Sequence, residues 1–190
     1  MQTPLEAATE GQIVIAAIKA RGGDAADFLL PLSPEHYQLV GIVVQWTAYA
    51  LLAAQQLIDF VEEQRGSPIR PANASLRDNE VIPLLMDYVC ELPISVEDGS
   101  ALVVGFTMIQ TMMDIRHHVA HMALRKHPEV DALIGLSLRR RENFKRAGIE
   151  PRYGEAMVAY IPLPELRANL APLEKNVNFA ANLYARVAVG

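Results

Sequence analysis

Residues 114–121, which read Asp-Ile-Arg-His-His-Val-Ala-His, hold most of the side chains in this sequence that can do chemistry. They contain three of the five histidines of the chain, together with Asp114 and Arg116. Histidine exchanges protons near neutral pH and ligates metals, whereas arginine stays charged and binds phosphate or carboxylate with a planar fork of donors. The segment therefore predicts a site for phosphoryl chemistry or for metal binding.

A helix through this segment places its arginine and its histidines on different faces. With ~100° per residue, Arg116 lies within about 60° of an apolar stripe. The stripe consists of Ile109, Met112, Val119 and Ala123. The polar face carries Asp114, His117, His118 and His121. Because an unpaired charge on a packing face is costly, Arg116 must find an acid, an interface or an anionic ligand.

The candidate acidic partners of Arg116 lie on neighbouring predicted helices. They are Asp59, Glu62 and Asp87. Such a pair is a purely structural alternative to phosphate binding.

Start and stop signals divide the chain into the helices that must position this segment. Thr3 and Ser33 each precede a proline and a nearby glutamate, and Ser95 with Asp98 forms a capping box. Gly22 and Gly66 follow the ends of two predicted helices. The sequence predicts helices over residues 4–20, 34–65, 79–91, 96–126 and 164–187.

Two prolines limit these helices. We expect Pro83 to lie in the first turn of its helix, where a proline is tolerated, and Pro172 to kink the last helix. Residues 67–74 are predicted to be a loop. Residues 131–160 contain strand-like runs at 133–138 and 157–161, and form either a hairpin-like excursion or a loop. The predicted fold is all-α, a bundle of four to five helices with this insertion.

Composition indicates one helical domain over residues 1–190, with residues 1–32 as an N-terminal extension. Hydrophobic residues make up 51% of the chain, which favours a buried oligomer interface. Cys90 is the single cysteine and no secretory signal is visible, so we expect a cytoplasmic protein. Residues 39–57 approach the length of a membrane span, but three glutamines interrupt them, and we expect a bundle helix without membrane contact.

The net charge of −5 is unevenly distributed. Residues 116–152 carry a charge of +5, so the rest of the chain carries −10. The densest basic run consists of Arg139, Arg140, Arg141, Lys145 and Arg146. A basic window on an acidic protein favours an anionic partner at one surface, although a solvated arginine-rich loop explains the same pattern.

Residues 116–121 resemble the R-x4-H motif of HEPN-domain proteins. The residue after the arginine is polar in that motif, as His117 is here, and the ending of a small residue before histidine matches Ala120 and His121. The order of elements is also similar: a long helix containing Trp46, a shorter helix, the motif helix, a variable insertion and a C-terminal helix. The resemblance covers roughly residues 36–188.

The resemblance implies a helical bundle that dimerises and brings two motif copies to a shared cleft. Many HEPN proteins are metal-independent endoribonucleases without a cofactor, often toxins or antiviral effectors paired with an antitoxin. By this likeness His121 is the catalytic acid or base, Arg116 holds the scissile phosphate and His117 supports it, with Asp114 and His118 beside them. The basic run 139–146 then contacts the RNA backbone. Other family members are non-catalytic modules that bind nucleotides or proteins.

A metal site is the main alternative from a different class. Asp114, His117 and His121 have the spacing that places ligands on one helical face, and more distant ligands are available at His36 and His127. Helical metalloproteins recruit ligands from several helices, and the sequence has no second HxxxH or ExxH motif. We therefore expect no resident metal.

Overall fold

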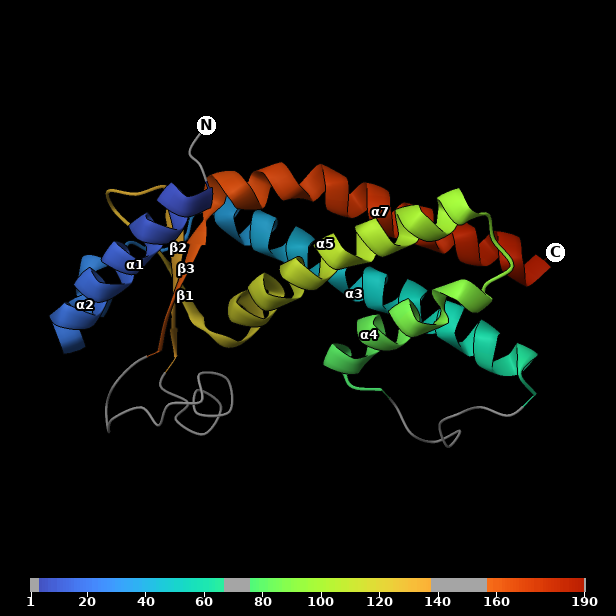
Figure 1. Cartoon of the computed structure of the whole chain (residues 1–190). Helices are drawn as coiled ribbons and strands as arrows, with labels where there is room; N and C mark the ends of the chain where they lie inside the picture. The colour runs from blue at the N-terminus through green and yellow to red at the C-terminus, as the bar shows by residue number, and fades with distance from the viewer. Residues whose placement is uncertain (1–3, 67–75, 138–156, 190) are drawn as a thin grey trace. The chain divides into compact units, whose positions relative to one another are not determined.

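A computed structural model describes residues 4–66, 76–137 and 157–189 of the chain (Figure 1). They belong to two compact units. Unit 1 comprises Met1–Gly41 and Ile115–Asn169, and unit 2 comprises Ile42–Asp114 and Leu170–Gly190. The expectation of one domain over residues 1–190 stays a prediction.

The described chain is mostly helical, with one small sheet (Figure 1). The α-helices are α1 (Pro4–Arg21), α2 (Ala25–Phe28), α3 (Pro34–Gln64), α4 (Asp78–Tyr88), α5 (Val96–His121) and α7 (Leu163–Val189). Two 3₁₀ turns are η1 (Gly22–Asp24) and η2 (Val89–Glu91). The strands β1 (Ala123–Lys126), β2 (Ala132–Ser137) and β3 (Met157–Pro162) form an antiparallel sheet in the order β1-β2-β3.

The local signals for helix ends are confirmed. Gly22 and Gly66 both have positive φ, at 57° and 68°, the left-handed conformation that glycine adopts without steric cost. At the start of α5, the backbone N–H of Asp98 donates to Ser95 Oγ over 3.0 Å, as the capping box requires. The predicted starts and ends of α1 and α3 are therefore confirmed to within a residue or two.

The expectation for Pro83 is wrong. Since α4 begins at Asp78, Pro83 lies inside the helix beyond its first turn. A proline there removes a backbone hydrogen bond, and burial of Val81, Ile82 and Leu85 on the same helix offsets that loss.

The all-α prediction needs correction because of the sheet. The strand-like runs 133–138 and 157–161 are confirmed as β2 and β3. The predicted helix 96–126 is too long, since α5 ends at His121 and Ala123 lies in β1, not on the helical stripe. The physical reason is the burial of Ala132–Gly135 in β2, whose backbone groups need partners on both edges. Residues 123–126 supply one edge, in register with Leu133–Leu136.

The core of unit 1 forms where α1, α2 and the sheet pack together. Its buried residues are Val14, Ile18, Ala25, Leu29, Ile134 and Val158. Gly11 allows α1 to approach the ring of Tyr160 on β3, and the Tyr160 hydroxyl donates to Glu10 over 3.0 Å. Burial, followed by this hydrogen bond to Glu10, raises the pKa of Tyr160 above its ordinary range.

The core of unit 2 is helical. Its largest fully buried side chains are Leu57, Ile58, Ile82, Leu85, Leu102, Phe106, Ile109 and Met112. Beyond the end of α3, Arg65 forms an ion pair with Glu91, with Arg65 Nε 2.8 Å from Glu91 Oε2, and its guanidinium lies 4.2 Å from the centre of the Tyr88 ring. The C-terminal end of α3 is thereby attached to η2.

By length and composition alone, α3 is apolar enough to cross a membrane. Buried core helices pass the same test, and Val43, Ala50, Ala54 and Leu57 are buried within the protein. The buried Thr47 hydroxyl donates to the Val43 carbonyl over 2.7 Å, so this polar group is satisfied inside the helix. The prediction of a protein without membrane contact stays a prediction.

We predict that Gly11→Ala destabilises the protein although alanine is the better helix former. The added Cβ would lie 2.9 Å from Tyr160 Cδ1, and overpacking of this kind costs about 1–3 kcal/mol, against a gain in helix propensity of up to about 1 kcal/mol. The matched control is Gly41→Ala in α3, where nothing lies within 4 Å of the new Cβ and stability should rise. Urea unfolding of both variants tests this, and equal stabilisation by both would contradict the packing of α1 on β3.

Candidate functional site

The predicted site occupies the last turns of α5. Arg116, His117 and His118 are half-buried there, Val119 is buried, and His121 is exposed as the last residue of the helix. The motif histidines are therefore reachable from solvent to different degrees, with His121 the most accessible.

The imidazole rings of His117 and His121 are in contact in a tilted arrangement. Their ring centroids are 4.5 Å apart, with an angle of 39° between the ring planes. Residues four apart lie one above the other on a helix, so the spacing of the motif produces this contact. The ring of His118 is 6.1 Å from that of His117 and nearly perpendicular to it, at 73°. The structure thus brings together two groups that can exchange protons at one exposed helix end.

Arg116 lies where the helical projection placed it. Ile109, Met112 and Val119 on the same stripe are buried, and Arg116 is half-buried with its Nε atom buried. Arg116 has interactions of its own within the protein. Its pairing with one of the three candidate acids of the sequence stays a prediction.

The supporting residue Asp114 is exposed on α5 and belongs to unit 2, whereas the motif residues that follow it belong to unit 1. Its role beside the histidines stays a prediction. The predicted RNA-binding residues Arg139, Arg140, Arg141, Lys145 and Arg146 lie outside the described residues.

The predicted helix 96–126 included Arg125, and the structure places this residue on β1. The side chains of β1 alternate between exposed and half-buried, and Arg125 is exposed, four residues after His121. The sequence Ala-Leu-Arg-Lys over residues 123–126 does not alternate between apolar and polar residues, so it carries no local signal that separates this edge strand from a helix end.

The two remaining histidines bond to nearby backbone. His36 Nδ1 accepts from the Ser33 N–H over 3.1 Å and lies 2.9 Å from Ser33 Oγ, at the start of α3. His127 is buried, and its Nδ1 accepts from the backbone N–H groups of Glu129 and Val130. These contacts use the Nδ1 atom of each ring, which is one of the two nitrogens through which a histidine can ligate a metal.

In the part of the chain that the structure describes, no group of three or more histidine, cysteine, aspartate or glutamate residues is placed to hold a metal ion. The spacing of Asp114, His117 and His121 thus lacks the additional ligands that a metal centre in a helical protein recruits from other helices.

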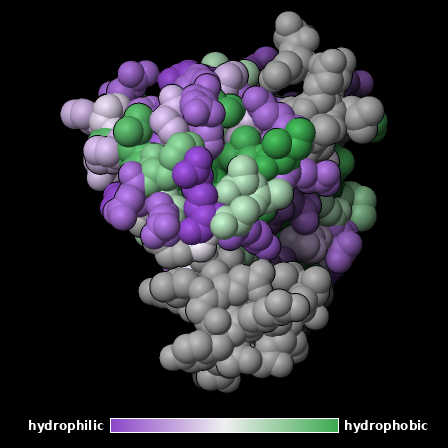
Figure 2. Space-filling model, turned by 90° about the vertical axis from the view of Figure 1, so that its left-hand side faces the viewer, coloured by the Kyte–Doolittle hydropathy of each residue, from purple (hydrophilic) through white to green (hydrophobic). Residues whose placement is uncertain are grey.

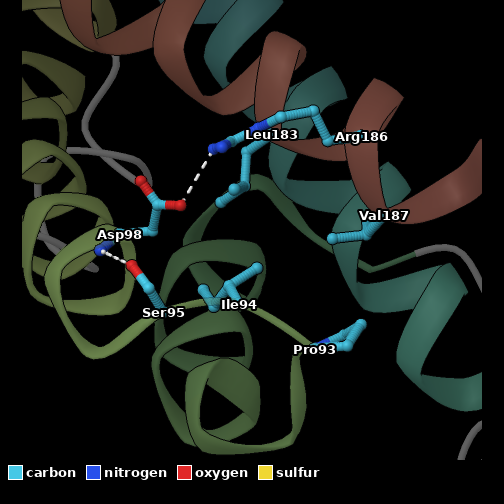
Figure 3. Close-up of a pocket in the computed structure, with 7 residues that line it drawn as sticks. All are labelled: Pro93, Ile94, Ser95, Asp98, Leu183, Arg186 and Val187. Carbon is cyan, nitrogen blue, oxygen red and sulfur yellow. Dashed lines mark hydrogen bonds and ion pairs between the residues drawn. The ribbon is translucent and has the colours of Figure 1, made fainter. Parts of the chain in front are cut away.

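A pocket of about 400 Å³ lies elsewhere, within unit 2 (Figure 3). It is lined by Pro93, Ile94, Ser95, Asp98, Leu183, Arg186 and Val187. Figure 3 shows the side chains of Asp98 and Arg186 pointing toward each other, and their charges pair over 3.0 Å. The pocket lining therefore combines this ion pair with apolar side chains such as Pro93, Ile94 and Leu183. Sequence reasoning had identified Ser95 and Asp98 only as a helix start.

Exposed apolar side chains on unit 1 are scattered. Figure 2 shows a small apolar area bordered by hydrophilic residues on the face that it draws. Among the described residues of unit 1, the exposed large hydrophobic side chains are Ile13, Leu30 and Tyr37. Isolated apolar residues are ordinary on protein surfaces. This face is therefore a weaker candidate for a binding site than the end of α5.

Comparison with protein-family models, with curated proteins and with solved structures gives no match. The likeness to HEPN proteins therefore rests on residues 116–121 and on the order of helices around them.

We predict that His121→Ala shifts the ring-proton resonances of His117 in NMR spectra. The imidazole of His121 lies 4.5 Å from that of His117, so its ring current acts on the neighbouring ring protons. His36→Ala is the control, since His36 bonds to Ser33 in α3 and makes no ring contact with His117 among the described residues. Unchanged His117 resonances in His121→Ala would contradict the contact between the two rings.

Proposed function

We propose that this protein is a metal-independent endoribonuclease of the HEPN type, acting as a toxin or antiviral effector. The observation that supports the proposal most directly is the ring contact between His117 and His121 at the exposed end of α5, on the helix that carries Arg116. Acid–base chemistry on a phosphodiester needs groups that titrate near neutrality together with a fixed cation, and these residue types provide both.

The proposed reaction begins when a base removes the proton from an RNA 2′-hydroxyl. The 2′-oxygen then attacks the adjacent phosphorus, and the bond from phosphorus to the 5′-oxygen of the next nucleotide breaks as an acid protonates that oxygen. The products are a 2′,3′-cyclic phosphate and a 5′-hydroxyl. We assign the acid or base to His121, support of its orientation to His117, and stabilisation of the phosphate charge to Arg116.

The different exposures of Arg116 and His121 favour a site made from two copies. The two residues lie about 140° apart around an ideal helix, and Arg116 is half-buried where His121 is exposed. One α5 helix therefore presents them in different directions. A twofold arrangement lets the arginine of one copy act beside the histidine of the other.

A non-catalytic HEPN-like module is the second candidate. Its support is the partial burial of Arg116 on the apolar stripe, which suits a structural interaction as well as a phosphate contact. Such a module binds nucleotides, or a regulatory protein such as an antitoxin, and leaves RNA intact.

We predict that the purified protein cleaves mixed RNA in the presence of a chelator. His121→Ala should lower the rate by about 10²–10⁴-fold, because it removes the acid or base. Arg116→Ala should lower it by about 10²–10³-fold, because it removes a fixed cation. His36→Ala is the matched control and should cleave like the wild type, since His36 bonds to Ser33 in α3.

Three outcomes would reject this proposal. RNA binding without cleavage would favour the non-catalytic module, and cleavage that requires an added divalent metal would favour the metal alternative. Equal activity of wild type and His121→Ala would point to a contaminating nuclease.

Mixing the two inactive variants tests the shared site. Arg116→Ala and His121→Ala should restore part of the activity when their subunits are exchanged, because one of the two sites in a mixed dimer is then intact. No restoration in a verified mixed dimer would place both residues of each site in one copy.

The basic run 139–146 gives a prediction about binding. Replacing Arg139, Arg140, Arg141, Lys145 and Arg146 by alanine should weaken the dependence of RNA affinity on salt. Each lost phosphate contact lowers the slope of log K against log salt by about 0.7 for single strands. Fluorescence anisotropy at several salt concentrations measures the slope, with catalytically inactive His121→Ala as the background. An unchanged slope would exclude this run from the RNA interface.

A further inference from the structure

The turn that joins β1 to β2 is held by two neighbouring side chains. Lys126 Nζ donates to the carbonyl of His127 over 2.9 Å and also to the carbonyl of Val130. His127 Nδ1 accepts from the N–H of Glu129 over 3.2 Å and from the N–H of Val130 over 3.1 Å. One side chain thus binds carbonyls of the turn, and the other binds its amides.

The imidazole of His127 lies in an environment that disfavours a positive charge. It is 5% exposed and meets the ring of Phe28 edge-on, with 5.4 Å between centroids. The guanidinium of Arg21 lies over the ring of Phe28, 3.7 Å from its centre. Burial lowers the pKa of His127 most, the charges of Lys126 and Arg21 lower it further, and Glu129 partly offsets them.

The hydrogen bonds require one protonation state. Both bonds to Nδ1 come from N–H donors, so Nδ1 must carry a lone pair and the ring proton must sit on Nε2. Protonation of Nδ1 would convert this acceptor into a donor that faces two other donors. Both hydrogen bonds would then be lost together. The new positive charge would also be repelled by the ammonium group of Lys126.

The same turn anchors β1. The N–H and carbonyl of Lys126 each bond to Leu30 over 2.9 Å, and the N–H of His127 donates to the Ala132 carbonyl over 3.1 Å. At its other end, β1 begins two residues after His121, where α5 ends. A change at the turn therefore acts on the strand that immediately follows the candidate site.

We propose that His127 is a pH-sensitive latch: its neutral imidazole closes the β1–β2 turn, and its protonated form releases that turn and loosens β1. Asp131 adds to the latch from the same turn, since it lies 3.8 Å from Lys126 Nζ and pairs with Arg167 over 2.9 Å. The latch is independent of the proposed ribonuclease activity.

The sign of the pH effect follows from linkage. Histidine in an unfolded chain has a pKa of ~6.5, and folding lowers the pKa of His127 below that value. Between the two values the unfolded chain binds more protons, so stability is complete above ~6.5 and falls as the pH falls toward the folded value. For one proton, the unfolding equilibrium constant rises by up to about tenfold per pH unit in this window.

His127→Asn tests the latch, because its amide oxygen can accept in place of Nδ1 and does not titrate. We expect urea unfolding to show that the wild type loses stability between about pH 7.5 and about pH 5.5 and that this variant loses less. The difference between the two proteins should amount to up to about tenfold in the unfolding equilibrium constant per pH unit. His36→Asn is the matched control, because it removes a half-buried histidine that lies outside the β1–β2 turn, and it should change the pH dependence less than His127→Asn does. An identical pH dependence of wild type and His127→Asn would overturn the proposal.

A measurement on the wild type decides the matter if His127→Asn does not fold. NMR titration should show His127 binding its proton at a lower pH than free imidazole, with the amide resonances of Glu129 and Val130 moving along the same curve. As His127 becomes protonated, the β1 amides should also lose protection against hydrogen exchange, measured after correction for the intrinsic exchange rates. A His127 that titrates like free imidazole, or one that titrates while these amides stay unchanged, would overturn the proposal.

Discussion

The burial of β2 is the constraint on which unit 1 depends. Ala132–Gly135 lie inside the protein, so the N–H and C=O groups of this strand must find partners on both edges. β3 supplies one edge and β1 the other. Because residues 123–126 are needed for β1, α5 has to end at His121. The same pairing forces the tight turn at residues 127–131, which Lys126 and His127 hold closed.

Much of the fold could be predicted from sequence, because helix ends are encoded locally. The glycines at 22 and 66 and the capping box at Ser95 determine the backbone within a few residues, and the structure places helix boundaries at each of them. The end of α5 could not be predicted in this way. Residues 123–126 become a strand only because β2, seven to thirteen residues further along, needs a partner, and such tertiary pairing overrides weak local propensity.

The candidate site also combines features that follow from local sequence with features that depend on tertiary contacts. The contact between His117 and His121 follows from helical spacing, and the projection placed Arg116 correctly beside Met112 and Val119. The partner of Arg116 could not be predicted, since a helical wheel gives the direction of a side chain and not what it meets. His127 shows the opposite case. Its sequence position suggested a spare metal ligand, whereas its Nδ1 is used by two backbone amides of a turn that only the sheet creates.

The position of the motif at a helix C-terminus has an electrostatic consequence for any anionic substrate. The last carbonyls of α5 carry partial negative charge, which repels phosphate and attracts cations. The Met122 N–H donates to the His118 carbonyl over 3.0 Å and neutralises only part of this effect. A pair of neutral imidazoles would therefore leave a phosphate unfavourably placed at His121. The proposed chemistry therefore needs arginine, which the described residues supply at Arg116 on the helix and at Arg125 on the following strand.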